Sequence, residues 1–178
     1  EEAVAVAKVD EKEFIGLRSE AKAAQSGIVA TEVQYGNYHG TLLTYFAKHY
    51  VDDDPAAWET KELKSPLALD AVARKTDEGL DLQVTWKGQP LEGVEVTLIS
   101  PAGQQTARNT NGEGIASFKN VAEGEVGFLV NHTVEAEGEA NGKPYTTASN
   151  FLSVTLRVPA PADKPSPVAD SPYKALPA

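Results

Sequence analysis

Cysteine and methionine are both absent from this chain of 178 residues. The lack of cysteine excludes disulfide bonds, thiolate metal sites and cysteine nucleophiles. The chain begins Glu1-Glu2-Ala3, a start typical of a protein that has lost its initiator together with a signal peptide. We therefore expect a bacterial protein that is secreted, displayed on the cell surface or periplasmic. No apolar run reaches the roughly 18 residues that a membrane helix needs, so the sequence predicts no membrane span.

The sequence motifs that usually mark enzymes are missing too. There is no Gly-x-Ser-x-Gly, no phosphate-binding loop, no dinucleotide fingerprint and no His-Glu-x-x-His. The three histidines do not stand beside a candidate nucleophile, as a catalytic triad would require. We expect a protein that is not an enzyme.

Basic residues are few compared with acidic ones, 16 against 26, which gives a formal net charge of -10. Such a charge argues against nucleic acid or an anionic membrane as the main partner. Hydrophobic residues make up 41% of the chain, a share typical of a globular domain. The length suits one domain with extensions.

The N-terminal region carries a helix signal. Asp10 can cap a helix, with Glu13 as its capping-box partner, while Val9 and Phe14 would form a hydrophobic staple. Apolar residues then follow at helical spacing, at Phe14, Leu17, Ala21 and Ala24. The pattern predicts an amphipathic helix over residues 11–25.

From Gly27 onward the pattern indicates strands. Between Leu80 and Trp86, apolar and polar residues alternate, as in a strand with one buried face. Asn141-Gly142 is typical of a tight hairpin turn. Short strands separated by turns favour a mainly antiparallel β-sandwich. The predicted strands cover residues 28–35, 41–50, 67–74, 80–86, 94–98, 115–118, 126–130, 132–139 and 145–158.

These patterns divide the chain into three parts. An N-terminal extended segment and helix occupy residues 1–27, and the sandwich occupies residues 28–158. Residues 159–178, here called the proline-rich tail, contain six prolines, so they should be extended or polyproline-like. We expect the tail to dock on its own body or on a neighbouring subunit.

Two segments resemble known families. Residues 88–96 (GQPLEGVEV) and 109–118 (NTNGEGIASF) resemble carboxypeptidase-regulatory-like and prealbumin-like sandwiches. Together with residues 42–50, 66–69, 131–135 and 138–145, they also resemble the C-terminal half of NikM-like, nickel-uptake-associated proteins, over residues 30–158. The resemblance implies an Ig-like or prealbumin-like fold and an accessory role in nickel or cobalt uptake. The N-terminal half of that family, with its histidine-rich start, has no counterpart here.

Metal-binding candidates are His132 and Glu135, with His39 and His49. Histidine with carboxylates suits nickel, cobalt or zinc, although no paired-histidine spacing supports such a site. The alternative is a solvated strand face, with His39 and His49 in an aromatic packing surface. Residues 52–54 are three consecutive aspartates that could help bind calcium, but they lack the spacing of a calcium loop.

We predict a non-enzymatic extracytoplasmic interaction module, acting as a self-assembling surface or filament subunit through its extended termini. Sandwich edges can accept a partner strand by β-augmentation. The predicted contact residues are Val4, Val6, Pro161, Pro165 and Tyr173. The alternative functions are a periplasmic divalent-metal-binding accessory protein and a carbohydrate-binding sandwich that uses Trp58 and Trp86.

Overall fold

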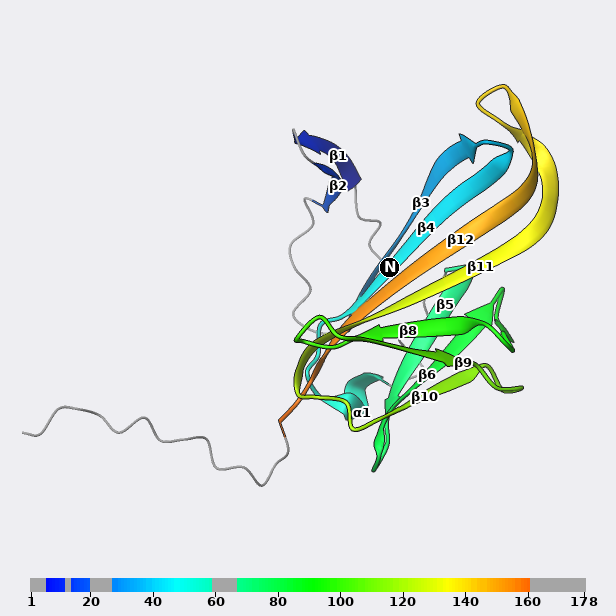
Figure 1. Cartoon of the computed structure of the whole chain (residues 1–178). Helices are drawn as coiled ribbons and strands as arrows, with labels where there is room; N and C mark the ends of the chain where they lie inside the picture. The colour runs from blue at the N-terminus through cyan, green and yellow to red at the C-terminus, as the bar shows by residue number, and fades with distance from the viewer. Residues whose placement is uncertain (1–5, 12–13, 20–26, 59–66, 161–178) are drawn as a thin grey trace, which may run out of the picture.

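The computed structural model describes residues 6–11, 14–19, 27–58 and 67–160, with side chains described from residue 27 onward. The protein is mainly β, and its body consists of two sheets that face each other (Figure 1). The larger, six-stranded sheet has the order β3-β4-β12-β11-β8-β9. Its strands are β3 (Ile28–Tyr38), β4 (Thr41–Tyr50), β8 (Glu95–Ile99), β9 (Gln105–Asn109), β11 (Gly124–Ala140) and β12 (Lys143–Val158).

The smaller, four-stranded sheet has the order β10-β6-β5, with β7 paired to β6. Its strands are β5 (Leu69–Lys75), β6 (Gly79–Trp86), β7 (Gln89–Pro90) and β10 (Ile115–Lys119). The predictions of a mainly β fold and of most strands are confirmed, including the hairpin turn at Asn141-Gly142. Strand β9 was not predicted, because all five of its residues are exposed and no buried alternation marks it.

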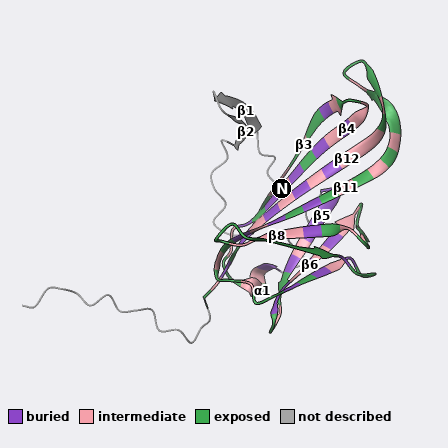
Figure 2. Ribbon diagram, viewed as in Figure 1, coloured by how far each residue is buried: buried purple, intermediate pink, exposed green. Residues whose placement is uncertain are grey.

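The core lies between the two sheets. Buried residues alternate with more exposed ones along the strands, as the purple bands in Figure 2 show. Leu82 and Val84 of β6 belong to one buried cluster with Val154 and Leu156 of β12. The rings of Phe118 and Phe128 meet with centroids 5.6 Å apart. This period-two pattern is what fixes the register of each strand against the core.

A short helix, α1 (Pro55–Trp58), closes one end of the core. Trp58 is 1% exposed, and its indole Nε1 donates a hydrogen bond to the carbonyl oxygen of Asp52 at 2.8 Å. The Trp58 ring packs on that of Tyr50, at a centroid distance of 6.0 Å. Trp58 therefore serves the core, which removes it as a stacking platform for carbohydrate.

One strand pairing is parallel. β12 lies beside β4 in parallel register, with Thr147 opposite Thr41, whereas the other pairings between described strands are antiparallel. The prediction of mainly antiparallel sheets is thus confirmed. β12, the last of the described strands, lies in the middle of the larger sheet and not at its edge.

Four strands of the larger sheet, β3, β4, β12 and β11, continue past the smaller sheet as a projection, here called the arm (residues 34–44 and 132–149; Figure 1). The two predicted strands at residues 126–130 and 132–139 are one 17-residue strand, β11. At the tip, Asn37 Nδ2 donates hydrogen bonds to the carbonyl oxygens of Lys143 and Pro144, at 2.9 and 2.8 Å. These bonds tie the two hairpin turns of the arm together.

The structure corrects the predicted N-terminal helix. β1 (Val6–Glu11) and β2 (Phe14–Ser19) pair antiparallel in a separate two-stranded sheet, in which Asp10 lies opposite Ile15. The remainder of the predicted helix, residues 20–25, lies outside the described residues. The β-branched and aromatic residues of both segments favour strand pairing, and an unpartnered helix of this length is only marginally stable in water.

Candidate functional site

The structure does not bring together the four residues predicted to bind a metal. His132 lies in the inward phase of β11, between Asn131 and Thr133, whereas Glu135 lies in the opposite phase. A bulge between Glu135 and Gly138 places Glu139 on the other face from Glu135, because one extra residue reverses the alternation. Within the part of the chain that the structure describes, no three His, Asp or Glu side chains gather as a metal site would require.

His132 packs on an aromatic residue of the smaller sheet. Its ring meets that of Trp86 edge to face, with centroids 5.1 Å apart, and Lys87 Nζ lies 5.2 Å from the centroid of the same indole. Burial lowers the pKa of His132 below its usual value of 6.5, because removal from water disfavours the charged imidazolium. His132 is therefore neutral near pH 7 and acts as a packing residue at the root of the arm.

The other two histidines lie at opposite ends of β4. His39 occupies the turn before β4 with a positive φ of 50°, and its ring contacts that of Tyr38. His49 lies near the far end of β4, on the outer face, with Nδ1 2.8 Å from Oγ1 of Thr155. At about 3.3 Å per residue along a strand, the two histidines are too far apart to share an ion.

The three consecutive aspartates also turn to different partners. The Asp52 carboxylate accepts a hydrogen bond from the backbone N–H of Gly27. The Asp53 Oδ2 atom lies 3.9 Å from Nε of Arg157. Asp54 Oδ1 accepts the N–H of Ala56 at 3.0 Å, at the start of α1. The three carboxylates serve the local structure and do not converge.

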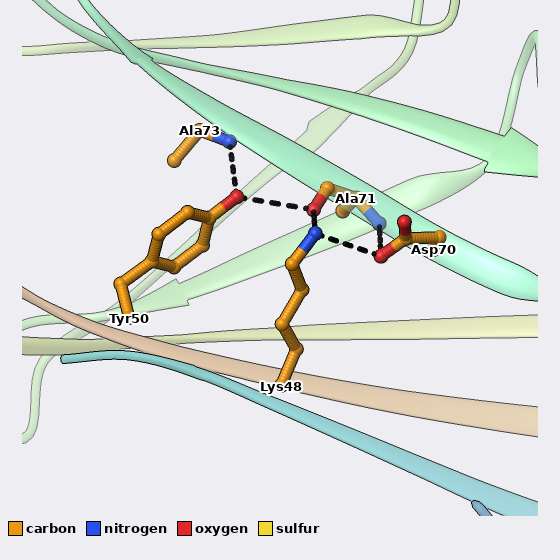
Figure 3. A network of polar contacts seen from close by, with 5 residues as sticks. All are labelled: Lys48, Tyr50, Asp70, Ala71 and Ala73. Atoms are coloured by element: carbon orange, nitrogen blue, oxygen red, sulfur yellow. Dashed lines mark hydrogen bonds and ion pairs between the residues drawn. The ribbon is translucent and has the colours of Figure 1, made fainter. Parts of the chain in front are cut away.

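A buried polar network joins the two sheets (Figure 3). Lys48 Nζ, on β4, donates hydrogen bonds to Asp70 Oδ1 at 3.0 Å and to the carbonyl oxygen of Ala71 at 2.9 Å, both on β5. The Lys48 side chain is 0% exposed. Tyr50 Oη donates to the same carbonyl at 3.4 Å and accepts the N–H of Ala73 at 3.1 Å. Ala71 N–H donates to Asp70 Oδ1 at 2.8 Å.

This network covers an open sheet edge. β5 is the last strand of the smaller sheet on its side, and the backbone groups of Ala71 and Ala73 would otherwise lack partners there. Unpaired buried backbone groups are costly, so the side chains of Lys48 and Tyr50 replace a neighbouring strand. The sequence analysis did not predict this network. The available signal was the position of Lys48 in the strand alternation, because it falls in the inward phase of β4 between Phe46 and Tyr50.

Two groups of the network have shifted pKa values. Burial, partly opposed by the hydrogen bond from Ala73, raises the pKa of Tyr50 to about 12. Burial also raises the pKa of Asp70, and the nearby Lys48 ammonium opposes that shift. Both shifts follow from the low polarity of the core, which disfavours charged forms.

The edge strand β3, unlike β5, has no side-chain network along its outer edge among the described residues. No other strand of the described ranges pairs with its outer edge, and its 11 residues (IVATEVQYGNY) include one charged residue, Glu32. Natural edge strands usually carry lysine, proline or a covering segment that blocks pairing with other chains. The one irregularity of β3 is a bulge between Gln34 and Gly36, close to the arm. β3 is therefore a strand edge suited to accept a partner.

Next to this edge, the outer face of the larger sheet carries a shallow aromatic groove. Tyr45 stacks on Phe151 with centroids 5.1 Å apart and planes 18° from parallel. Tyr35, in the bulge of β3, packs edge-on against Tyr45 at 6.3 Å. Leu129 and Tyr45 are each 45% exposed there. The groove encloses about 520 Å³, and its lining residues include Thr31, Val33, Tyr45, Ala47, Glu95, Thr97, Leu129, Asn131, Phe151 and Ser153.

The groove has almost no charge, since Glu95 is the one acidic residue among those that line it, and none of them is basic. Exposed apolar patches of this kind usually mark sites where a protein binds a partner or a ligand. The rings of Tyr45 and Phe151 turn faces toward each other, so they do not form a flat platform for a sugar ring. The geometry suits a polypeptide more than a carbohydrate.

The predicted contact residues in the termini lie largely outside the described ranges. Val4, Pro161, Pro165 and Tyr173 are outside them, and Val6 begins β1, opposite Ser19. The outer-face residues Tyr45 and Phe151 were not singled out as a pair, because their adjacency depends on the parallel pairing of β4 with β12. Within the described ranges, no helix has the length and apolar character that would let it cross a membrane.

Comparison with protein-family models, with curated proteins and with solved structures gives no match for this chain. The resemblance to NikM-like proteins therefore stays a prediction.

Proposed function

We propose that this protein is a non-enzymatic, extracytoplasmic interaction module with an Ig-like or prealbumin-like β-sandwich, which assembles with other copies of itself. The observation that carries the proposal is the open β3 edge. It is long and bears a single charge. Backbone hydrogen bonds along such an edge supply the affinity for an added strand.

The N-terminal hairpin of β1 and β2 supplies a complementary segment. It forms a sheet of its own, apart from the two sheets of the body. A two-stranded hairpin alone is at best marginally stable in water. Its addition to the β3 edge of a neighbouring copy would extend that copy's sheet and bury the hairpin's own unpaired edge. The alternating segment from Ala3 to Ala7, which contains no proline, suits this role.

The contrast with β5 supports this assignment. The β5 edge is closed by Lys48 and Tyr50, so the chain protects one edge with buried side chains. On β3, exposed Val29 (40% exposed) stands where an edge-blocking lysine would be expected. An apolar edge that no described strand covers favours aggregation unless a partner binds there.

Light scattering of the full chain across a range of concentrations tests the proposal. We expect a mass larger than one chain, which Val29→Lys should lower, because a charge at the edge opposes strand addition. The matched control is Thr106→Lys on β9, the exposed strand at the other edge of the same sheet. A monomer at every concentration, or equal effects of the two substitutions, would refute self-assembly through β3. Deletion of residues 1–9 should lower the mass in the same way.

The metal-binding alternative depends on the resemblance to NikM-like proteins. Calorimetric titration of the full chain with nickel, cobalt, zinc and calcium tests it independently of assembly. A ligand that binds only the native protein must also raise the melting temperature.

A further inference from the structure

The aromatic groove on the outer face lies close to the origin of the proline-rich tail. β12 contributes Phe151 and Ser153 to the groove and ends at Val158, just before the tail. We propose that the groove is the binding site for the proline-rich tail of the same chain. This inference shares with the proposed function the idea that extended termini are ligands, but it uses the outer face and not the β3 edge.

The tail is long enough to reach the groove. Ser153 precedes Val158 by five positions in β12, a distance of about 17 Å at about 3.3 Å per residue. A polyproline-like segment spans about 3.1 Å per residue, so the stretch from Pro159 to Ser171 covers about 37 Å. After reversing direction beyond Val158, the tail can lie along the outer face over Phe151 and Tyr45.

The composition of the tail suits an aromatic groove. Its six prolines favour the polyproline conformation, which costs little further entropy on binding and docks into grooves lined by aromatic residues. Tyr45 and Phe151 supply such a lining. Asn131, Ser153 and Thr97 at the same groove supply hydrogen-bonding groups for the carbonyls that a proline-rich segment leaves unpaired.

Charge favours the same ligand. The tail contains two aspartates and two lysines, so its net charge is zero, although the whole chain carries -10. A neutral segment therefore approaches the acidic body without repulsion. Glu95, the one charged lining residue, offers an ionic partner to Lys164 or Lys174.

Covalent attachment makes the chain's own tail the favoured ligand. A short flexible connection gives a tethered segment an effective concentration in the millimolar range. At micromolar protein, a copy's own tail therefore outcompetes the tail of a neighbour. The groove is occupied within one chain, while the β3 edge stays available for contacts between chains.

Disulfide trapping in the full chain tests this proposal, and the absence of native cysteine makes engineered pairs unambiguous. The test variant combines Ser153→Cys in the groove with Ser166→Cys in the tail, which a polyproline-like segment places about 22 Å from Pro159, at the level of Ser153 once the chain has reversed. The control combines Ser117→Cys with Ser166→Cys. Ser117 lies on β10, seven positions before Gly124, which pairs with Val158. Ser117 is exposed whereas Ser153 is partly buried, so accessibility alone would favour the control.

Both variants are oxidised with glutathione disulfide at micromolar protein, and intramolecular bonds are followed by intact mass and by non-reducing gels. A disulfide needs Cα atoms within about 7 Å. We expect the groove pair to close at least about tenfold faster than the control pair, as a docked segment has a raised effective concentration at its site. Tyr45→Ala should reduce the rate to that of the control, while Tyr38→Ala, which changes an exposed tyrosine at the arm tip (57% exposed), should not.

Equal rates for the two pairs would overturn the proposal, as would a rate that Tyr45→Ala leaves unchanged. A disulfide-linked dimer as the main product would overturn docking within one chain. Melting curves of each variant confirm that it folds. None of these outcomes depends on the mass measured by light scattering, so failure here and failure of self-assembly through β3 can be told apart.

Discussion

The ammonium of Lys48 lies 3.0 Å from the Asp70 carboxylate in the interior of the protein, and the two residues belong to different sheets. The pair therefore does more than neutralise two buried charges. Through Ala71, it also closes the edge of β5. Its energetic role can be tested because removal of either partner leaves the other charge buried.

Lys48→Met should destabilise the protein by about 3–5 kcal/mol, because it leaves the Asp70 carboxylate buried without its partner. Urea denaturation at pH 7 measures this change. The double variant Lys48→Met/Asp70→Leu should recover part of the loss, as an apolar pair carries no desolvation penalty. The control is Lys119→Met, which breaks the exposed ion pair with Glu78 and should cost less than about 1 kcal/mol. Equal losses at the two lysines would contradict a special role for the buried pair.

Tyr50→Phe removes the hydroxyl that bonds the Ala71 carbonyl and the Ala73 N–H. We expect a loss of about 1–3 kcal/mol, the usual cost of leaving buried polar groups unsatisfied. Hydrogen exchange gives the more specific reading, since the amide of Ala73 should exchange faster in the variant. Unchanged protection at Ala73 would show that the hydroxyl does not close the β5 edge.

The depressed pKa of His132 predicts a loss of stability in mild acid. The folded protein holds His132 neutral to lower pH than the unfolded chain does, so between pH 6.5 and the folded pKa the unfolded state binds more protons. Stability is full above about pH 6.5 and falls as the pH drops. His132→Gln should flatten this slope in urea denaturation series from pH 7.5 to 5. A comparable flattening in His49→Gln, on the other face of the same sheet, would contradict the assignment.

Gly114 holds the loop before β10 in a conformation that other residues resist. Its φ is +74°, and an added Cβ would lie 2.5 Å from the carbonyl oxygen of Val84. Gly114→Ala should cost more than the roughly 1–2 kcal/mol of left-handed strain alone, because backbone must also move. Gly112→Ala is the control, since its Cβ would approach Glu92 no closer than 3.9 Å. Thermal melts that shift equally in both variants would refute this reading.

The strands of the body were largely predictable, because apolar alternation in segments such as β6 reports directly on burial. Strands β1 and β2 were not predictable. The residues around Asp10 and Phe14 are compatible with the start of a helix and with a pair of strands, and only the pairing of β1 with β2 decides between the two. β9 lacks a buried face and so leaves no trace in the pattern.

The candidate binding surface was only partly predictable. The open sandwich edge follows from the fold class, but its identity as β3 depends on the strand order. Tyr45 and Phe151 become neighbours through a pairing between residues 106 apart, which local patterns do not encode. The residues predicted to bind a metal do not converge, because strand alternation puts His132 and Glu135 on opposite faces of β11 and the length of β4 separates His39 from His49.

The central position of β12 has a consequence for how the protein forms. Among the described strands, β12 alone links β3-β4 to β11-β8-β9 in the larger sheet, so before residues 143–158 are in place these strands form two separate halves. Such long-range pairing slows folding and leaves strand edges exposed during synthesis. The body can therefore reach its native state only after residues 143–158 have been made, because β12 joins the two halves of the larger sheet.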